Sequence, residues 1–119
     1  MSAFNLNHVT LNFIIDDVST AGQVYIPVPD GFGGEVVEII TALNGAIGTA
    51  DAVLTPKIAG TAMTNGAVTI ATASSAAGDV DVSRPTSANE VAAGEAIEIE
   101  TNGASTNTVR VFGTVVIKR

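Results

Sequence analysis

Short runs in which apolar and polar residues alternate dominate the chain, and the helical period is largely missing. In the run from His8 to Ile15 every second side chain is apolar, so one face of a strand would be buried and the other would face water. Similar runs predict further strands at residues 23–28, 52–59, 67–72, 78–83, 96–101 and 108–118. Proline cannot donate to a β-ladder, so Pro27 in the second run and Pro29 just after it favour an edge or a strand end, and Pro56 in the run 52–59 favours an edge strand.

The segment 35–43 is ambiguous, because its apolar residues suit either a turn of helix or a strand. Its β-branched content and the Asn44-Gly45 pair that follows favour a strand. Asn-Gly also occurs at Asn65 and Asn102, and this pair between apolar runs is a strong hairpin signal. The clearest predicted hairpin joins residues 96–101 to residues 108–118.

Seven to eight short strands without a convincing helix predict an all-β, single-domain antiparallel β-sandwich, with a small barrel as the alternative. A jelly-roll-like sandwich is the preferred topology. The chain has 119 residues, which suits one domain: an uncharged N-terminal arm at residues 1–7 and the sandwich at residues 8–119. Residues 72–94 are rich in Ala, Ser, Gly and Asp, and they are expected to be mostly a loop that could carry binding.

Twelve acidic residues oppose five basic ones, and the formal net charge is −7. Binding to nucleic acid or to an anionic membrane needs clustered Lys and Arg, so this charge argues against both partners. The absence of Cys excludes thiol chemistry and Cys-based zinc sites. The sequence also shows no secretory signal and no apolar run of about 20 residues that could cross a membrane. Synthesis in the cytoplasm of the cell that makes the protein is the expectation.

Candidate catalytic residues are few. His8 is the single histidine, and no Gly-x-Ser-x-Gly elbow offers it a nucleophile. Glu98 and Glu100 share one face of a predicted strand, and paired carboxylates could serve a glycosidase, but a solvated strand face explains them more simply. The acidic pairs lack an EF-hand pattern for calcium. We therefore expect no enzyme activity, no metal, no cofactor and no small-molecule substrate.

The Gly-rich segment around Phe32 lacks the Lys-Ser/Thr of a phosphate-binding loop, so a flexible turn is expected there. Phe32 itself is either tucked back over the end of the sandwich or presented to a partner. The candidate partner contacts are Phe4 in the arm, His8, Phe32 and Arg84 in the loop.

Several stretches between residues 34 and 119 are rich in Ala, Gly and Thr. They are GTADAVLT from Gly48, GTAMTNGAVTIA from Gly60, AAGDV from Ala76, VAAGEAIEIETNG from Val91, and VRVFGTVVIKR from Val109. In these stretches the chain resembles the capsid decoration (cement) proteins of tailed bacteriophages. That resemblance implies a β-sandwich protomer, commonly a homotrimer, on the outer surface of the virion. There it would clamp neighbouring copies of the major capsid protein against the pressure of the packaged DNA.

The leading hypothesis is therefore a virion structural protein that binds and stabilises a phage capsid. The alternative is a receptor- or glycan-binding module of a phage tail or fibre, although four Phe, one Tyr and no Trp supply few rings for sugar stacking. The strands also carry more apolar residues than one core needs, and these either line an interface or pack a second covered face: Ile14, Val37, Ile39, Leu43 and Val116.

Overall fold

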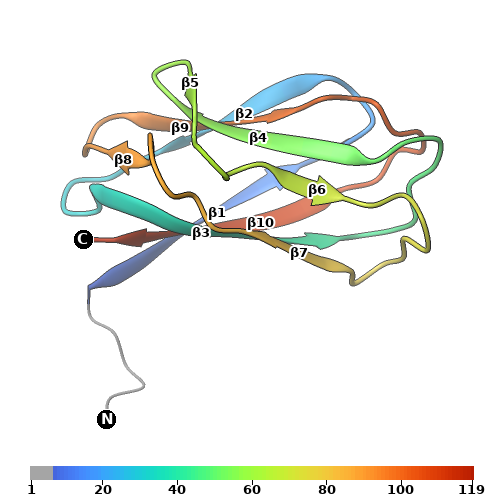
Figure 1. Ribbon diagram of the computed structural model, residues 1–119, viewed down its shortest axis with the longest axis horizontal. Helices are drawn as coiled ribbons and strands as arrows, with labels where there is room; N and C mark the ends of the chain where they lie inside the picture. Colours follow the sequence, from blue (N-terminus) through green and yellow to red (C-terminus); the bar gives the residue numbers. More distant parts are fainter. Residues whose placement is uncertain (1–6) are drawn as a thin grey trace, which may run out of the picture.

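The computed structural model describes residues 7–119, and these residues form two antiparallel sheets packed face to face (Figure 1). The strands are β1 (His8–Ile15), β2 (Gly22–Pro27), β3 (Gly34–Leu43), β4 (Ala52–Ile58), β5 (Thr61–Ala62), β6 (Val68–Ile70), β7 (Val80–Ser83), β8 (Glu90–Val91), β9 (Ala96–Thr101) and β10 (Val111–Lys118). The β1 sheet has the order β1-β10-β3-β7, with β8 also paired to β3. The β2 sheet has the order β2-β9-β4-β5, with β6 also paired to β4. The expected all-β sandwich is confirmed.

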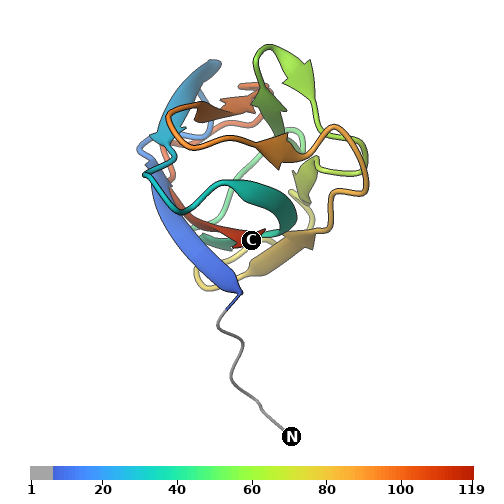
Figure 2. The same cartoon turned by 90° about the vertical axis from the view of Figure 1, so that its left-hand side faces the viewer.

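The strand pairing is that of a long hairpin rolled up into two layers. The first strand pairs with the last, β2 pairs with β9, β3 pairs with β7 and β8, and β4 pairs with β5 and β6. Successive pairs alternate between the two sheets, which is the jelly-roll arrangement. Residues 7–119 form ten strands rather than seven to eight, because the two strands that follow the tip of the rolled hairpin are each split into two short pieces: β5 and β6, which pair with β4, and β7 and β8, which pair with β3. Figure 2 shows the two layers from the end at which β10 reaches the C-terminus.

Within the 72–94 segment, β7 corresponds to the strand expected at residues 78–83, whereas β8 is a strand where a loop was expected; both form one edge of the β1 sheet. The segment 35–43 is a strand, as its β-branched residues indicated. It contains a bulge where β3 faces Val116 and Ile117 of β10, and Val37 is the extra residue. Ile39 and Leu43 are buried in the core, whereas Val37 and Val116 are only half-buried and Ile14 is exposed.

The expectation that Pro56 would move its strand to an edge is wrong. β4 lies between β9 on one side and β5 with β6 on the other. The carbonyl of Pro56 accepts a hydrogen bond of 3.0 Å from the amide of Met63, and the N and C=O of a strand residue point to the same side. The missing N–H of Pro56 therefore faces the gap between β5 and β6, where no ladder bond is needed. Pro27 ends the edge strand β2, as expected.

The predicted hairpin between residues 96–101 and 108–118 is also wrong, because β9 and β10 belong to different sheets. The Asn44-Gly45 and Asn102-Gly103 pairs lie in segments that cross from one sheet to the other. The tight two-residue hairpin turn joins β4 to β5 instead, and there Ala59 and Gly60 both have positive φ, 51° and 81°. Asn-Gly marks places where the chain can turn, but the contacts of both sheets decide which strands pair.

The core forms between the inward faces of the two sheets. Both layers contribute β-branched and leucine side chains that are almost completely buried, among them Ile39, Val115, Leu54 and Ile97. Across the β1–β10 pair, Phe13 lies opposite Gly113, and its ring occupies the space where a side chain of Gly113 would be. This packing seals the core beside the edge strand β1.

Candidate functional site

The outer face of the β1 sheet carries an exposed group of apolar side chains. Of the five large apolar side chains that are exposed in residues 7–119, four lie here: Ile14, Val80, Val82 and Phe112. The cross-strand register explains the grouping. Ile14 pairs with Phe112, Phe112 with Ala42, and Ala42 with Val80, so four outward apolar residues form one row across the sheet.

The next row along the sheet places Ile40 opposite Val82. We call the set Ile14, Ile40, Ala42, Val80, Val82 and Phe112 the apolar patch. Because Ala42 is small and stands between larger neighbours, the face is hollowed there, with a depression of about 510 Å³ over the patch. Scattered exposed apolar residues are ordinary, but a contiguous group rimmed by polar residues is typical of a surface that another macromolecule covers.

Charged side chains border the patch. Arg84 pairs with Glu38 at 3.1 Å, and 73% of the Arg84 side chain is exposed. Arg110 pairs with Asp16 at 3.4 Å, and Asp16 is two residues from Ile14 in the sequence. Exposed ion pairs of this kind add little stability, so a partner can recruit their charges at small cost. The patch therefore has an apolar centre and a charged rim, which is the usual anatomy of a protein–protein contact.

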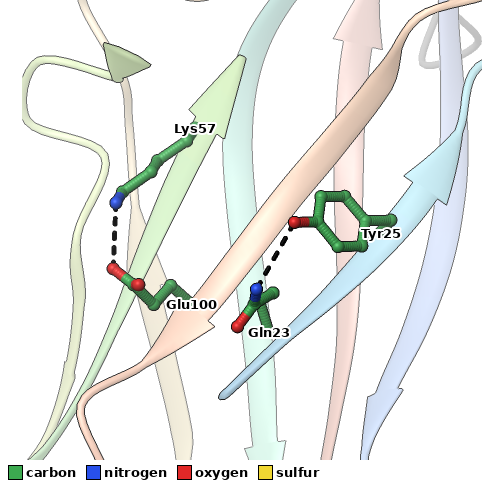
Figure 3. A network of polar contacts seen from close by, with 4 residues as sticks. All are labelled: Gln23, Tyr25, Lys57 and Glu100. Atoms are coloured by element: carbon green, nitrogen blue, oxygen red, sulfur yellow. Dashed lines mark hydrogen bonds and ion pairs between the residues drawn. The ribbon is translucent and has the colours of Figure 1, made fainter. Parts of the chain in front are cut away.

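The outer face of the β2 sheet is polar by contrast. Lys57 of β4 pairs with Glu100 of β9 at 3.0 Å, and the amide of Gln23 donates to the Tyr25 hydroxyl at 3.4 Å on β2 (Figure 3). The hydrogen bond and the charge of Glu100 raise the pKa of Lys57 above its ordinary value. Glu98 and Glu100 share this face, as expected, and Glu100 is engaged in an ion pair on an open sheet surface.

The structure distributes the four predicted contact residues unequally. His8 begins β1, opposite Lys118, and alternation places it on the same outer face as Ile14. Arg84 reaches that face through its ion pair with Glu38. Phe32 is partly buried and packs against the core, so the tucked alternative is confirmed. Phe4 lies outside the described residues.

Sequence reasoning identified Ile14 as a surplus apolar residue but missed Val80, Val82 and Phe112. Phe112 is apolar in a strand where the inward positions are also apolar, and this break in alternation was a usable signal. Val80 and Val82 both point outward, because in β7 the inward positions belong to Asp81 and Ser83. That inversion could not be recognised before the pairing of β7 with β3 was known.

Two carboxyl groups also have a shifted pKa, and neither belongs, among the described residues, to a cluster that could hold a metal ion. Within residues 7–119, no group of three or more His, Asp or Glu side chains could hold a metal ion. Hydrogen bonds from Ser19 and Thr20 lower the pKa of Asp17. Desolvation, with a smaller contribution from the charge of Asp79, raises the pKa of Asp81. Residues 7–119 also include no helix that is long and apolar enough to span a membrane.

No family model matches the sequence, and no curated protein matches it either.

Proposed function

We propose that this protein is a virion structural protein that decorates the outer surface of a tailed-phage capsid and stabilises the shell. The apolar patch is the observation that carries the proposal. It would cover a surface of the major capsid protein, with Arg84 and Glu38 at the rim. The resemblance in the sequence supplies the identity of the partner, and the patch supplies the surface.

The physical argument rests on where the apolar side chains lie. Patch residues belong to strands and not to loops, so their geometry is held by the sandwich and little ordering is needed on binding. Burying one large apolar side chain contributes on the order of 1.5–3 kcal/mol, which makes a single patch a modest anchor. Many copies on one lattice would gain the rest through avidity.

The fold supports the proposal only by analogy, since jelly rolls occur in viral capsid proteins and also in lectins. The homotrimer that the resemblance implies stays a prediction, as does a location on the virion surface. The proposal includes no enzymatic activity and no cofactor.

The test is co-sedimentation with capsids of the source virus from which the protein has been stripped. We expect saturable binding of the unaltered protein. Phe112→Ser and Val82→Ser should each weaken it by about tenfold, equivalent to ~1.4 kcal/mol, because each removes an anchor from the centre of the contact. Tyr25→Ser is the matched control, since it removes an aromatic side chain that is 60% exposed on the opposite face.

Binding that survives both patch variants, or that fails only with Tyr25→Ser, would refute the assignment of the surface. An unaltered protein that remains in the supernatant at all concentrations would refute decoration itself.

A second candidate is supported by Tyr25. Its exposed ring lies on the polar face, with Gln23 bonded to its hydroxyl and Glu98 opposite it in the register. An exposed ring flanked by hydrogen-bonding groups can stack a sugar, which suits the glycan-binding module of a tail or fibre. A glycan array probed with the unaltered protein and with Tyr25→Ala tests this. Hits that disappear in Tyr25→Ala support it, and an array without hits contradicts it.

A further inference from the structure

The four edges of the sandwich differ in how they are protected against pairing with another strand. β2 ends in Pro27, the β5/β6 edge is broken at residues 63–67, and the β7/β8 edge is broken at residues 84–89. β1 is continuous over eight residues and contains neither proline nor an acidic or basic residue apart from His8. In the described part of the chain, β1 is an end strand and pairs only with β10. A long, unbroken, uncharged edge is the type that accepts another strand.

The backbone of β1 has groups oriented for such pairing. The carbonyl of Asn7 accepts a hydrogen bond of 2.7 Å from the amide of Arg119, so the backbone of Asn7 faces the C-terminal strand. The backbone groups of a strand face alternate sides, and the β1–β10 register is regular throughout. The N–H and C=O groups of Thr10, Asn12 and Ile14 therefore point away from β10, along the open edge of the sheet.

We propose that a second copy of this chain occupies that edge, with the two β1 strands antiparallel about a two-fold axis. A two-fold contact uses the same surface on both copies, so it requires an edge that complements itself. In such a pair, the outward side chains of β1 in one copy must lie opposite the outward side chains of β1 in the second copy. A register centred on Asn12 satisfies this condition, placing Asn12 opposite Asn12 and Thr10 opposite Ile14 of the second copy.

Charge favours a second copy at this edge. The net charge of −7 makes copies repel one another, so a contact between them belongs where acidic residues are scarce. The inward-facing pairs in the proposed register are wholly apolar: Val9 with Ile15 and Leu11 with Phe13. At each end, His8 lies opposite Asp16 of the second copy, whose side chain is 85% exposed. In this register no like charges lie directly opposite each other.

The pairing would join the two β1 sheets edge to edge, with both apolar patches on the same side of the joined sheet. If the proposed docking on a capsid holds, one dimer would therefore present two patches to the shell and bind bivalently. The dimer itself does not depend on that function. It differs from the trimer that the resemblance implies, since a trimer needs a head-to-tail contact instead.

Sedimentation equilibrium and light scattering on the free protein test the inference. The unaltered chain should have about twice the 12.0 kDa mass of a protomer. Asn12→Lys should weaken dimerisation by at least about tenfold, because two lysines then face each other across the axis. Thr114→Lys is the matched control, since Thr114 lies beside Asn12 on the same face and donates to it at 3.0 Å. Thr114→Lys adds the same charge as Asn12→Lys and removes the same hydrogen bond between residues 12 and 114, but its lysine lies on β10, one strand away from the edge.

Thr10→Pro is the second variant. It removes an edge N–H without removing a bond to β10, so it should also give a monomer that keeps the circular dichroism of the folded chain. A monomeric or trimeric unaltered protein, or a dimer that persists in both Asn12→Lys and Thr10→Pro, would overturn the inference. Dimerisation without any binding to capsids would refute only the proposed function, and capsid binding by a monomer would refute only the dimer.

Discussion

The two margins of the sandwich are built in opposite ways. At the closed margin, formed by β5, β6, β7 and β8, the interrupted strands are tied to each other across the two sheets. The Ser83 hydroxyl donates to the Gly66 carbonyl at 2.7 Å, and the Thr64 and Thr86 amides donate to backbone carbonyls across the margin at 3.0 and 2.9 Å. At the open margin, β1 and β2 are joined through the connection between them, where the Thr101 hydroxyl donates to the Val18 carbonyl at 3.0 Å. The breaks in the β5/β6 and β7/β8 edges protect the closed margin from pairing with another strand. The continuous strand β1 leaves the open margin available for such pairing.

The largest effect is expected from Gly113→Ala, which tests how the open margin is sealed. An added methyl group would overlap the Phe13 ring that covers Gly113, so Phe13 must move and the β1–β10 contact must loosen. We expect a loss of ~3 kcal/mol in the free energy of unfolding, at the upper end of the usual cost of overpacking, because the added methyl group meets several atoms of the ring. Urea unfolding followed by circular dichroism measures it.

Gly22→Ala is the control for that experiment. Gly22 lies on β2 at the same margin, and apart from its two neighbours in the chain no residue has an atom within 4 Å of the added methyl position. We expect a change within about 0.5 kcal/mol. Equal losses for the two variants would show that the Phe13 contact with Gly113 does not control the margin.

A smaller effect is expected from breaking one side-chain bond at each margin. Ser83→Ala leaves the buried carbonyl of Gly66 without its partner, and Thr101→Val does the same to the carbonyl of Val18. Each should lower the free energy of unfolding by ~1–2 kcal/mol. Hydrogen exchange separates them: the amides of Thr64 and Thr86 should exchange faster in Ser83→Ala only. Faster exchange there in both variants would mean that the margins are not independent.

The smallest effect concerns pH, and the two margins respond with opposite sign. Asp81, at the closed margin, has a pKa raised above 3.8, mainly by desolvation, so the folded state binds its proton more tightly than the unfolded state does. Its contribution to stability therefore falls as pH rises from 3.8 through the raised value. Asp81→Asn should raise the melting temperature slightly at pH 7.

Asp17, at the open margin, has a pKa lowered below 3.8 by hydrogen bonds from Ser19 and Thr20. Its contribution is present above pH 3.8 and is lost as pH falls through the lowered value, so Asp17→Asn should lower the melting temperature slightly at pH 7. Thermal unfolding at a series of pH values measures both variants. A shift of the same sign in the two would contradict the assignment.

Alternation along the chain determined the longer strands and, in β1, β2, β9 and β10, their inward faces, because the side-chain direction in a strand depends only on local geometry with a period of two. Residues 8–15, 96–101 and the ambiguous 35–43 were therefore predictable as strands. The polar character of the β2-sheet face was visible in Glu98 and Glu100, and the uncharged nature of β1 could be read from the sequence alone.

Only the tertiary structure decided which strands pair and which positions become edges. Pro56 can lie inside a sheet because its missing N–H faces the gap between β5 and β6. Asn102-Gly103 connects the two sheets because β9 pairs with β4 and β10 pairs with β3, not with each other. The apolar patch likewise exists because the register aligns Ile14, Phe112 and Val80 from distant parts of the chain. Pairing depends on contacts between residues far apart in sequence, and a local pattern does not contain them.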